Sequence, residues 1–232
     1  MDTIATIIAA LLGGVIGSLG AQWLGERYRR SQDIEATRRD VAVRHLIQLQ
    51  DALESLWFRI DNLAFRGGKQ VMDAGYYETS TIYVIGYALA HKRLLTVEGA
   101  YAKLDVFQPG FARSLEEDLE SLEKALGDEA RTATSFYRYE RRALADFLLN
   151  WDGLWRVLSY TEFASASRSE DAEAVVGPAR RFLTRLSEQQ ASEVLRATSA
   201  TLQTLHSATG IHIAHAIQSP YPTDVRSVGE TP

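Results

Sequence analysis

The feature that most constrains this chain is an uncharged, apolar run near its start. From Thr3 to Leu24 there are 22 residues without Asp, Glu, Lys or Arg. As a helix, a run of this length reaches roughly 30 Å, the thickness of the hydrocarbon core of a bilayer. A signal peptide would open on Lys or Arg, and a buried core helix would carry more polar residues at helical spacing. We therefore predict a transmembrane helix.

The charges that flank this run predict its orientation. Arg27, Arg29 and Arg30 follow it, whereas an acidic residue precedes it. Basic residues are enriched on the cytoplasmic side of membrane spans, and Trp23 and Tyr28 suit the interface between lipid and water. The prediction is a single-pass protein of the bacterial inner (plasma) membrane, with the N-terminus outside, the remainder in the cytoplasm and the lipid bilayer as a partner.

Small residues recur every four positions inside the same run, at Gly13, Gly17 and Ala21. This spacing lets two helix backbones approach closely, which is how membrane spans associate. It predicts self-association in the membrane through these residues. The alternative is that small residues are common in spans and have no such role, and the sequence leaves both interpretations open.

Composition excludes several classes of function. The 232 residues include no cysteine, which excludes a disulfide scaffold, a thiolate zinc site, an iron–sulfur site and a cysteine nucleophile. The formal net charge is −5, from 25 basic and 30 acidic residues, and this disfavours a protein that coats nucleic acid. Five prolines and 16 glycines are too few for a fibrous or disordered chain.

Beyond the run, apolar residues recur at helical spacing. No Pro or Gly interrupts residues 26–66, and Leu46 to Leu63 follow the three–four step of a heptad seam, as in a coiled coil. This pattern predicts a stalk helix that ends at Gly67-Gly68. Further helices are expected at about 77–104, 112–126 and 132–151 and from Pro178 to about 217, with Gly210 as a kink, and no alternating strand is evident. The sequence leaves open whether the helix from 132 continues past Gly153 to Phe163.

These patterns predict an all-α fold in which the transmembrane helix continues into a long stalk helix and a cytoplasmic helical bundle. The expected parts are residues 1–25 as the transmembrane helix, 26–66 as a basic collar and stalk helix within the bundle, 67–219 as the remainder of the bundle, and 220–232 as a flexible tail.

The known catalytic motifs are missing from the sequence. It contains no GxxxxGK phosphate loop, no GxGxxG dinucleotide loop, no GxSxG nucleophile elbow and no HExxH zinc motif. We therefore predict that the chain is not an enzyme and uses no cofactor.

Histidine provides one metal hypothesis. His212 and His215 lie three residues apart, and His206 lies six residues before His212. Residues three apart share a helix face, so two imidazoles could hold one ion together with a third ligand. The alternative is that these are ordinary polar positions on a terminal helix. His91, within Ala-His-Lys-Arg, is expected to be solvated.

Residues 135–149, SFYRYERRALADFLL, interleave aromatic and basic side chains. Tyr137, Arg138, Arg141 and Arg142 could stack on a base and pair with phosphate, which predicts a site for a nucleotide or an RNA fragment. The alternative is that the aromatic residues belong to the core, while Arg138 and Arg142 pair with acidic residues of the same segment or of the helix at 112–126.

Two segments carry a resemblance to a family. The run STIYVIGYALAHKRLLTVEG, residues 80–99, and the later FYRYERRALADF resemble uncharacterised bacterial single-span membrane proteins that pair a Ser-Thr-x-Tyr helix with an Arg-x-Glu-x-Arg-Ala segment. Arg141 stands where Gln is expected in that family. The resemblance implies a cytoplasmic helical domain in which the two segments pair, and it brings neither an assigned function nor an active site.

Together these features predict a membrane-anchored, non-enzymatic interaction or assembly module. Its expected partners are copies of itself, joined through the span and the stalk, or a cytoplasmic protein, and a nucleic-acid partner is disfavoured. The alternative is a membrane-tethered sensor or effector that binds a nucleotide or an RNA fragment, as in bacterial stress responses or phage defence.

Overall fold

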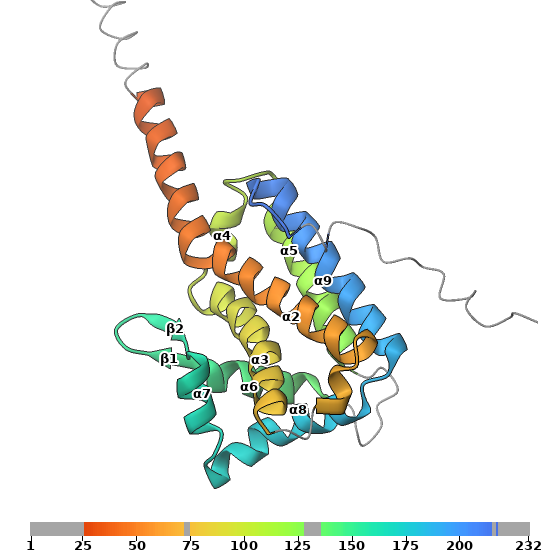
Figure 1. The fold of residues 1–232 in the computed structure, drawn as a ribbon. Coiled ribbons are helices and arrows are strands. Elements are labelled where there is room, and N and C mark those ends of the chain that lie inside the picture. Colours follow the sequence, from red (N-terminus) through yellow and green to blue (C-terminus); the bar gives the residue numbers. More distant parts are fainter. Residues whose placement is uncertain (1–25, 72–74, 128–135, 215–216, 218–232) are drawn as a thin grey trace, which may run out of the picture. The chain divides into compact units, whose positions relative to one another are not determined.

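The computed structural model describes residues 26–71, 75–127, 136–214 and 217 (Figure 1). The chain divides into two compact units, Met1–Asp40 and Val41–Pro232. In the first unit, residues 26–40 are helical. Four residues predicted to lie at a membrane interface are exposed on this helix: Arg27, Tyr28, Arg29 and Arg30.

The described helices contradict the predicted membrane location. Across the four described ranges, no helix is both long and apolar enough to cross a bilayer. Charged side chains explain this, because α3 (Tyr76–Val97) carries Lys92 and Arg93, and α9 (Glu188–Thr209) carries Glu193 and Arg196. The expectation of a single-pass inner-membrane protein with a cytoplasmic bundle is corrected accordingly. The residues predicted for the span and its interface, Gly13, Gly17, Ala21 and Trp23, lie outside the described residues.

The second unit begins with a π-helical turn, η1 (Ala42–Leu46), followed by α2 (Ile47–Phe65). The heptad-like residues are 0–3% exposed, so this seam packs inside the bundle: Leu46, Leu49, Leu53, Leu56, Ile60 and Leu63. The helix ends where predicted, because Gly67 adopts the left-handed region (φ 79°), which side chains disfavour. A short 3₁₀ turn, η2 (Gly68–Val71), follows.

The predicted helix at 77–104 is divided into α3 and a short α4 (Tyr101–Leu104). Gly99 has φ 63° and causes this break. The helix predicted at 112–126 is confirmed as α5 (Phe111–Leu126), whose Leu115, Leu119, Leu122 and Leu126 are buried.

The helix predicted from about 132 ends before Trp151 and does not continue past Gly153. Instead, α6 (Arg138–Leu148) leads into a two-stranded antiparallel hairpin, β1 (Leu149–Trp151) and β2 (Trp155–Val157), and then α7 (Tyr160–Ala166). Leu149 pairs with Val157, and Gly153 in the turn has φ 73°, a conformation that reverses the chain and interrupts a helix.

The last predicted helix is also divided in two. A 3₁₀ turn, η3 (Glu170–Ala172), leads into α8 (Glu173–Arg185), which contains Pro178 inside the helix and not at its start. Ser187 caps α9 by accepting a hydrogen bond from the Gln190 backbone N–H. Gly210, with φ 71°, ends α9 and does not kink it.

The second unit is therefore a helical bundle, which confirms the all-α prediction apart from the small hairpin. α9 packs against both α2 and α5, and α3 packs against both α2 and α6 (Figure 1). Polar contacts link the same pairs: Trp57 donates to Ser199 at 3.0 Å, and Thr204 donates to Asp118 at 2.6 Å. This arrangement brings the C-terminal half of α3 beside α6, which carries the predicted arginine cluster.

Candidate functional site

The arginines predicted to bind a ligand line one pocket of about 290 Å³. We call it the charged pocket. Its walls come from α3, α4, α5 and α6, and it is lined by Leu89, Lys92, Arg93, Thr96, Tyr101, Glu116, Glu120, Glu123, Arg138, Arg141, Arg142 and Ala145. Helical spacing explains the acidic wall, because residues three and four apart on α5 share one face.

The start of α6 positions the arginines. Glu140 accepts a hydrogen bond from the Tyr137 backbone N–H at 2.8 Å, which closes a capping arrangement around the first turn. Glu140 also pairs with Arg181 of α8 at 3.2 Å. These contacts fix the start of α6, and its first two turns carry Arg138, Arg141 and Arg142 into the pocket wall.

Arg141 is the most buried of these cations, with 8% of its surface exposed. It donates from one terminal nitrogen to the carbonyl of Phe136, whereas its Nε is buried and has no hydrogen-bond partner among the described residues. Burial lowers the pKa of Arg141, although nearby Glu123 opposes this effect. An arginine nevertheless stays protonated at neutral pH, so the wall holds a buried positive charge with an unused donor.

The Tyr101 hydroxyl is a second buried group in the charged pocket without a partner among the described residues. Burial raises the pKa of Tyr101, and Glu116, Glu123 and Glu120 raise it further. The phenol is therefore neutral and able to donate a hydrogen bond.

Ion pairs neutralise only part of the basic wall. Lys92 lies 2.9 Å from Glu123, which joins α3 to α5. Arg93 and Arg142 share one carboxylate, that of Asp146, at 3.0 and 3.7 Å. Arg138 is exposed and makes no ion pair within the described ranges. The basic wall therefore carries more positive charge than its own carboxylates neutralise.

Tyr137, which was predicted to stack on a bound base, lies outside the charged pocket. Tyr137 does not line the charged pocket, and its ring stacks on Tyr139, with centroids 5.7 Å apart. Tyr139 is 70% exposed, whereas Phe136 is fully buried, so only part of this aromatic group belongs to the core. The alternative ion pairing is found for Arg142, which pairs with Asp146.

The structure describes two of the three predicted metal ligands. His206 Nδ1 lies 2.7 Å from the carbonyl oxygen of Ile211, and His212 is exposed. His215 lies outside the described residues. No group of three metal-binding side chains occurs in the part of the chain that the structure describes.

Comparison with known proteins adds no relative. No family model, curated protein or solved structure matches this chain. The functional argument therefore depends on the geometry of the site.

Sequence reasoning missed Lys92, Arg93, Tyr101 and the acidic wall. Glu116 and Glu120 are exposed and Glu123 is half-buried, and all three line the charged pocket. Their three–four spacing was a usable signal for a shared face, but nothing local indicated that this face lies opposite α6.

Proposed function

We propose that this protein is a non-enzymatic binding module whose charged pocket holds a small ligand with a phosphate at one end and hydrogen-bond donors at the other. The observation that carries this proposal is Arg141, a buried guanidinium whose Nε lacks a partner among the described residues. Buried donors in proteins are nearly always satisfied, and each one left unsatisfied costs about 1–3 kcal/mol. A bound anion would satisfy this one.

The basic wall suits the phosphate end of the ligand. Arg138, Arg141 and Arg142 come from successive turns of one helix, and guanidinium groups bind phosphate oxygens through paired N–H donors. Such charge-assisted hydrogen bonds are about twice as strong as neutral ones.

The acidic wall suits the other end of the ligand. Glu116 and Glu120 present carboxylates, which accept hydrogen bonds, and the same wall would repel a second anionic group. A guanine base offers adjacent N–H donors and would match such acceptors. Opposite charges on the two walls therefore favour a ligand with an anionic group at one end and hydrogen-bond donors at the other over a ligand that is anionic throughout.

Pocket size separates the two predicted ligand classes. At about 290 Å³ the charged pocket lies at the lower end of the range for small-molecule sites. A mononucleotide is a better match for this volume than a stretch of RNA. Among the predicted alternatives, we therefore favour nucleotide binding over RNA binding.

Calorimetric titration with GMP, guanosine and ribose 5-phosphate tests this proposal. We expect GMP to bind most tightly, because only GMP engages both walls. The double variant Arg138→Gln/Arg142→Gln should weaken GMP binding by at least about tenfold, because two charge-assisted hydrogen bonds are lost. Arg113→Gln is the control, since Arg113 lies on α5, is 84% exposed and pairs with Glu117 outside the pocket. Equal binding of guanosine and GMP would refute the proposal.

A second candidate function, self-assembly through the stalk, is supported by exposed apolar residues on α2. Ile47, Phe58 and Phe65 are 47%, 43% and 37% exposed. Their spacings of 11 and 7 residues place them on one helix face, separate from the buried seam. A second copy of the chain could cover this face.

Sedimentation velocity tests the assembly proposal. We expect Phe58→Lys to reduce an oligomer to monomers, whereas Phe107→Leu, a change away from α2, should leave the oligomer intact. A parent protein that sediments as a monomer at all concentrations would contradict the proposal.

A further inference from the structure

A second pocket, separate from the charged one, lies between η1, the C-terminal half of α3 and the hairpin. Its volume is about 520 Å³. We call it the hairpin pocket. It is lined by Arg44, His45, Gln48, Tyr87, His91, Leu94, Glu98, Leu154, Trp155, Arg156 and Val157.

His91 is a buried side chain of this pocket whose hydrogen-bonding groups are unsatisfied among the described residues. The sequence predicted a solvated histidine, and this is wrong, because the side chain is 3% exposed. Neither ring nitrogen has a hydrogen-bond partner among the described residues. Tyr87 packs its ring against the imidazole edge to face, with centroids 4.5 Å apart, and so fixes its position without satisfying it. Two unsatisfied nitrogens on one buried ring are rare in proteins.

The charge state of His91 restricts what it can bind. Burial lowers the pKa of His91 to about 4, and the neighbouring His45 contributes. At neutral pH the ring is therefore uncharged, with one N–H donor and one acceptor nitrogen. The two nitrogens point away from each other, so a planar ligand meets one of them, with an acceptor for the N–H or a donor for the other nitrogen.

The charged residues around the hairpin pocket are engaged with one another. His45 lies 3.4 Å from Glu98. Arg156 donates two hydrogen bonds to Glu162, at 2.9 and 2.7 Å, and this interaction lowers the pKa of Glu162 to about 2. Arg44 is exposed at the rim. This pairing leaves little net attraction for a charged ligand.

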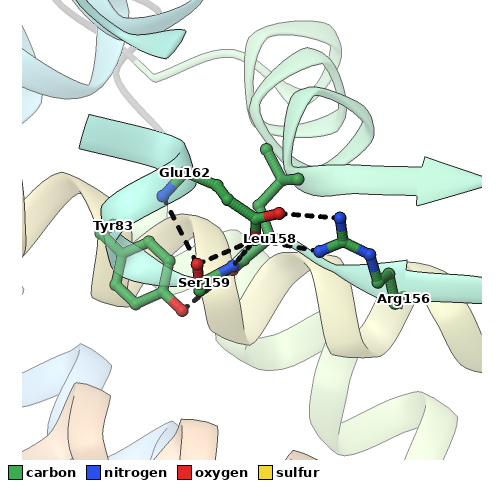
Figure 2. Close-up of polar contacts among 5 residues, drawn as sticks. All are labelled: Tyr83, Arg156, Leu158, Ser159 and Glu162. Carbon is green, nitrogen blue, oxygen red and sulfur yellow. Dashed lines mark hydrogen bonds and ion pairs between the residues drawn. The ribbon is translucent and has the colours of Figure 1, made fainter. Parts of the chain in front are cut away.

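The hairpin supplies an apolar wall that is held in place. Trp155, Val157 and Leu154 face the pocket. Figure 2 shows how the strand end is fastened: Arg156 reaches Glu162, which also accepts from Ser159, and Tyr83 donates to the carbonyl of Leu158 at 3.0 Å. Trp155 therefore adds an aromatic surface to the pocket that His91 also lines.

The π-helical turn contributes the third side. A π-turn widens the helix locally and is often found at functional sites. Here η1 contains both Arg44 and His45. The pocket thus combines an aromatic wall, a neutral donor–acceptor ring and a widened helical turn.

From this geometry we propose that the hairpin pocket binds an uncharged, planar heterocycle with a hydrogen-bonding ring edge, stacked on Trp155 and hydrogen-bonded to one ring nitrogen of His91. The inference does not depend on the function proposed for the charged pocket, because the two pockets share no residue. The volume of about 520 Å³ lies within the range of small-molecule sites.

Titration of the full chain with 2-pyridone, toluene and benzoate tests the proposal by calorimetry and by NMR of the His91 ring. 2-Pyridone has a donor and an acceptor, either of which can bond to one nitrogen of His91; toluene has a similar ring without them, and benzoate is anionic. We expect 2-pyridone to bind at least about tenfold more tightly than the other two and to shift the His91 resonances. Tighter binding of toluene or benzoate would overturn the proposal.

Three variants complete the test. His91→Phe should abolish the preference for 2-pyridone over toluene and should remain folded, because it removes an unsatisfied buried group. Trp155→Ala should weaken 2-pyridone binding by about tenfold. Trp151→Ala is the matched control. The ring centroids of Trp151 and Trp155 lie 5.2 Å apart in the same hairpin, but Trp151 does not line the pocket. Unchanged 2-pyridone binding by His91→Phe, or equal losses in the two tryptophan variants, would overturn the proposal.

Discussion

Gly86 controls how closely α3 and α6 pack, and these helices carry most of the basic wall of the charged pocket. A Cβ atom at Gly86 would lie 2.8 Å from Leu148 Cδ1 and 3.1 Å from Leu144 Cγ, both on α6. Gly86→Ala would therefore force α6 away from α3 or distort these leucines. Such overpacking costs about 1–3 kcal/mol, whereas replacing glycine by alanine within a helix contributes about 1 kcal/mol of stability. We expect a net loss of about 1 kcal/mol.

Gly177 in α8 provides a comparison in which the added Cβ meets only a flexible side chain. Its Cβ would lie 2.7 Å from Oε1 of Glu173, the flexible end of a side chain that is 63% exposed and pairs with Arg180. The carboxylate can move aside with little loss, because an exposed ion pair contributes about 1 kcal/mol or less. Gly177 precedes Pro178, and a Cβ before proline disfavours the helical region, which offsets the gain in helix propensity. Gly177→Ala should therefore change the free energy of unfolding by less than about 0.5 kcal/mol.

Urea and thermal unfolding followed by far-UV circular dichroism measure both changes. For a domain of this size, a loss of 1 kcal/mol corresponds to a decrease in Tm of about 2–4 °C. Gly86→Ala should also weaken GMP binding, because the basic wall moves, whereas Gly177→Ala should not. If Gly86→Ala lowered the stability no more than Gly177→Ala does, the packing argument for α3 and α6 would be wrong.

Two further predictions concern the hairpin region and its buried histidine. Ser159→Ala should destabilise the protein by about 1 kcal/mol in the same unfolding assay, because the Ser159 hydroxyl caps α7 by accepting a hydrogen bond from the Glu162 backbone N–H. An unchanged unfolding midpoint would contradict this role. The free energy of unfolding should fall as pH decreases from 6.5 to 4, because unfolded His91 binds a proton below pH 6.5 whereas folded His91 does so only near its pKa of about 4. The contribution is up to about 3 kcal/mol, and the loss should be smaller in His91→Phe; equal pH profiles for the two proteins would count against it.

Much of the bundle follows from local apolar spacing. In α5, for example, Leu115, Leu119, Leu122 and Leu126 repeat at three and four residues and are all buried. The end of α2 was also predictable, because a glycine pair stops a helix by a local conformational preference. Such elements can be predicted from their own residues, without information about the segments that pack against them.

The hairpin and the charged pocket depend on contacts between distant segments. Residues 149–157 are apolar at spacings that suit either a helix or two short strands. The hairpin combines a left-handed turn at Gly153 with a contact from α3, in which Tyr83 donates to the Leu158 carbonyl at 3.0 Å. His91 is flanked by Lys92 in a polar stretch, yet it is buried because the hairpin and η1 cover it. The acidic wall likewise depends on α5 lying opposite α6, which no local pattern encodes.

The measurement that tests the central claim most directly is the NMR signal of the Arg141 Nε–H during titration with GMP. The signal is assigned by its loss in Arg141→Lys. The account predicts a saturable shift of this resonance, larger than that of the exposed Arg113, because the unpartnered Nε–H would gain a phosphate acceptor. An Arg141 signal that does not move at saturating GMP would contradict the claim that the charged pocket binds a phosphate-bearing ligand.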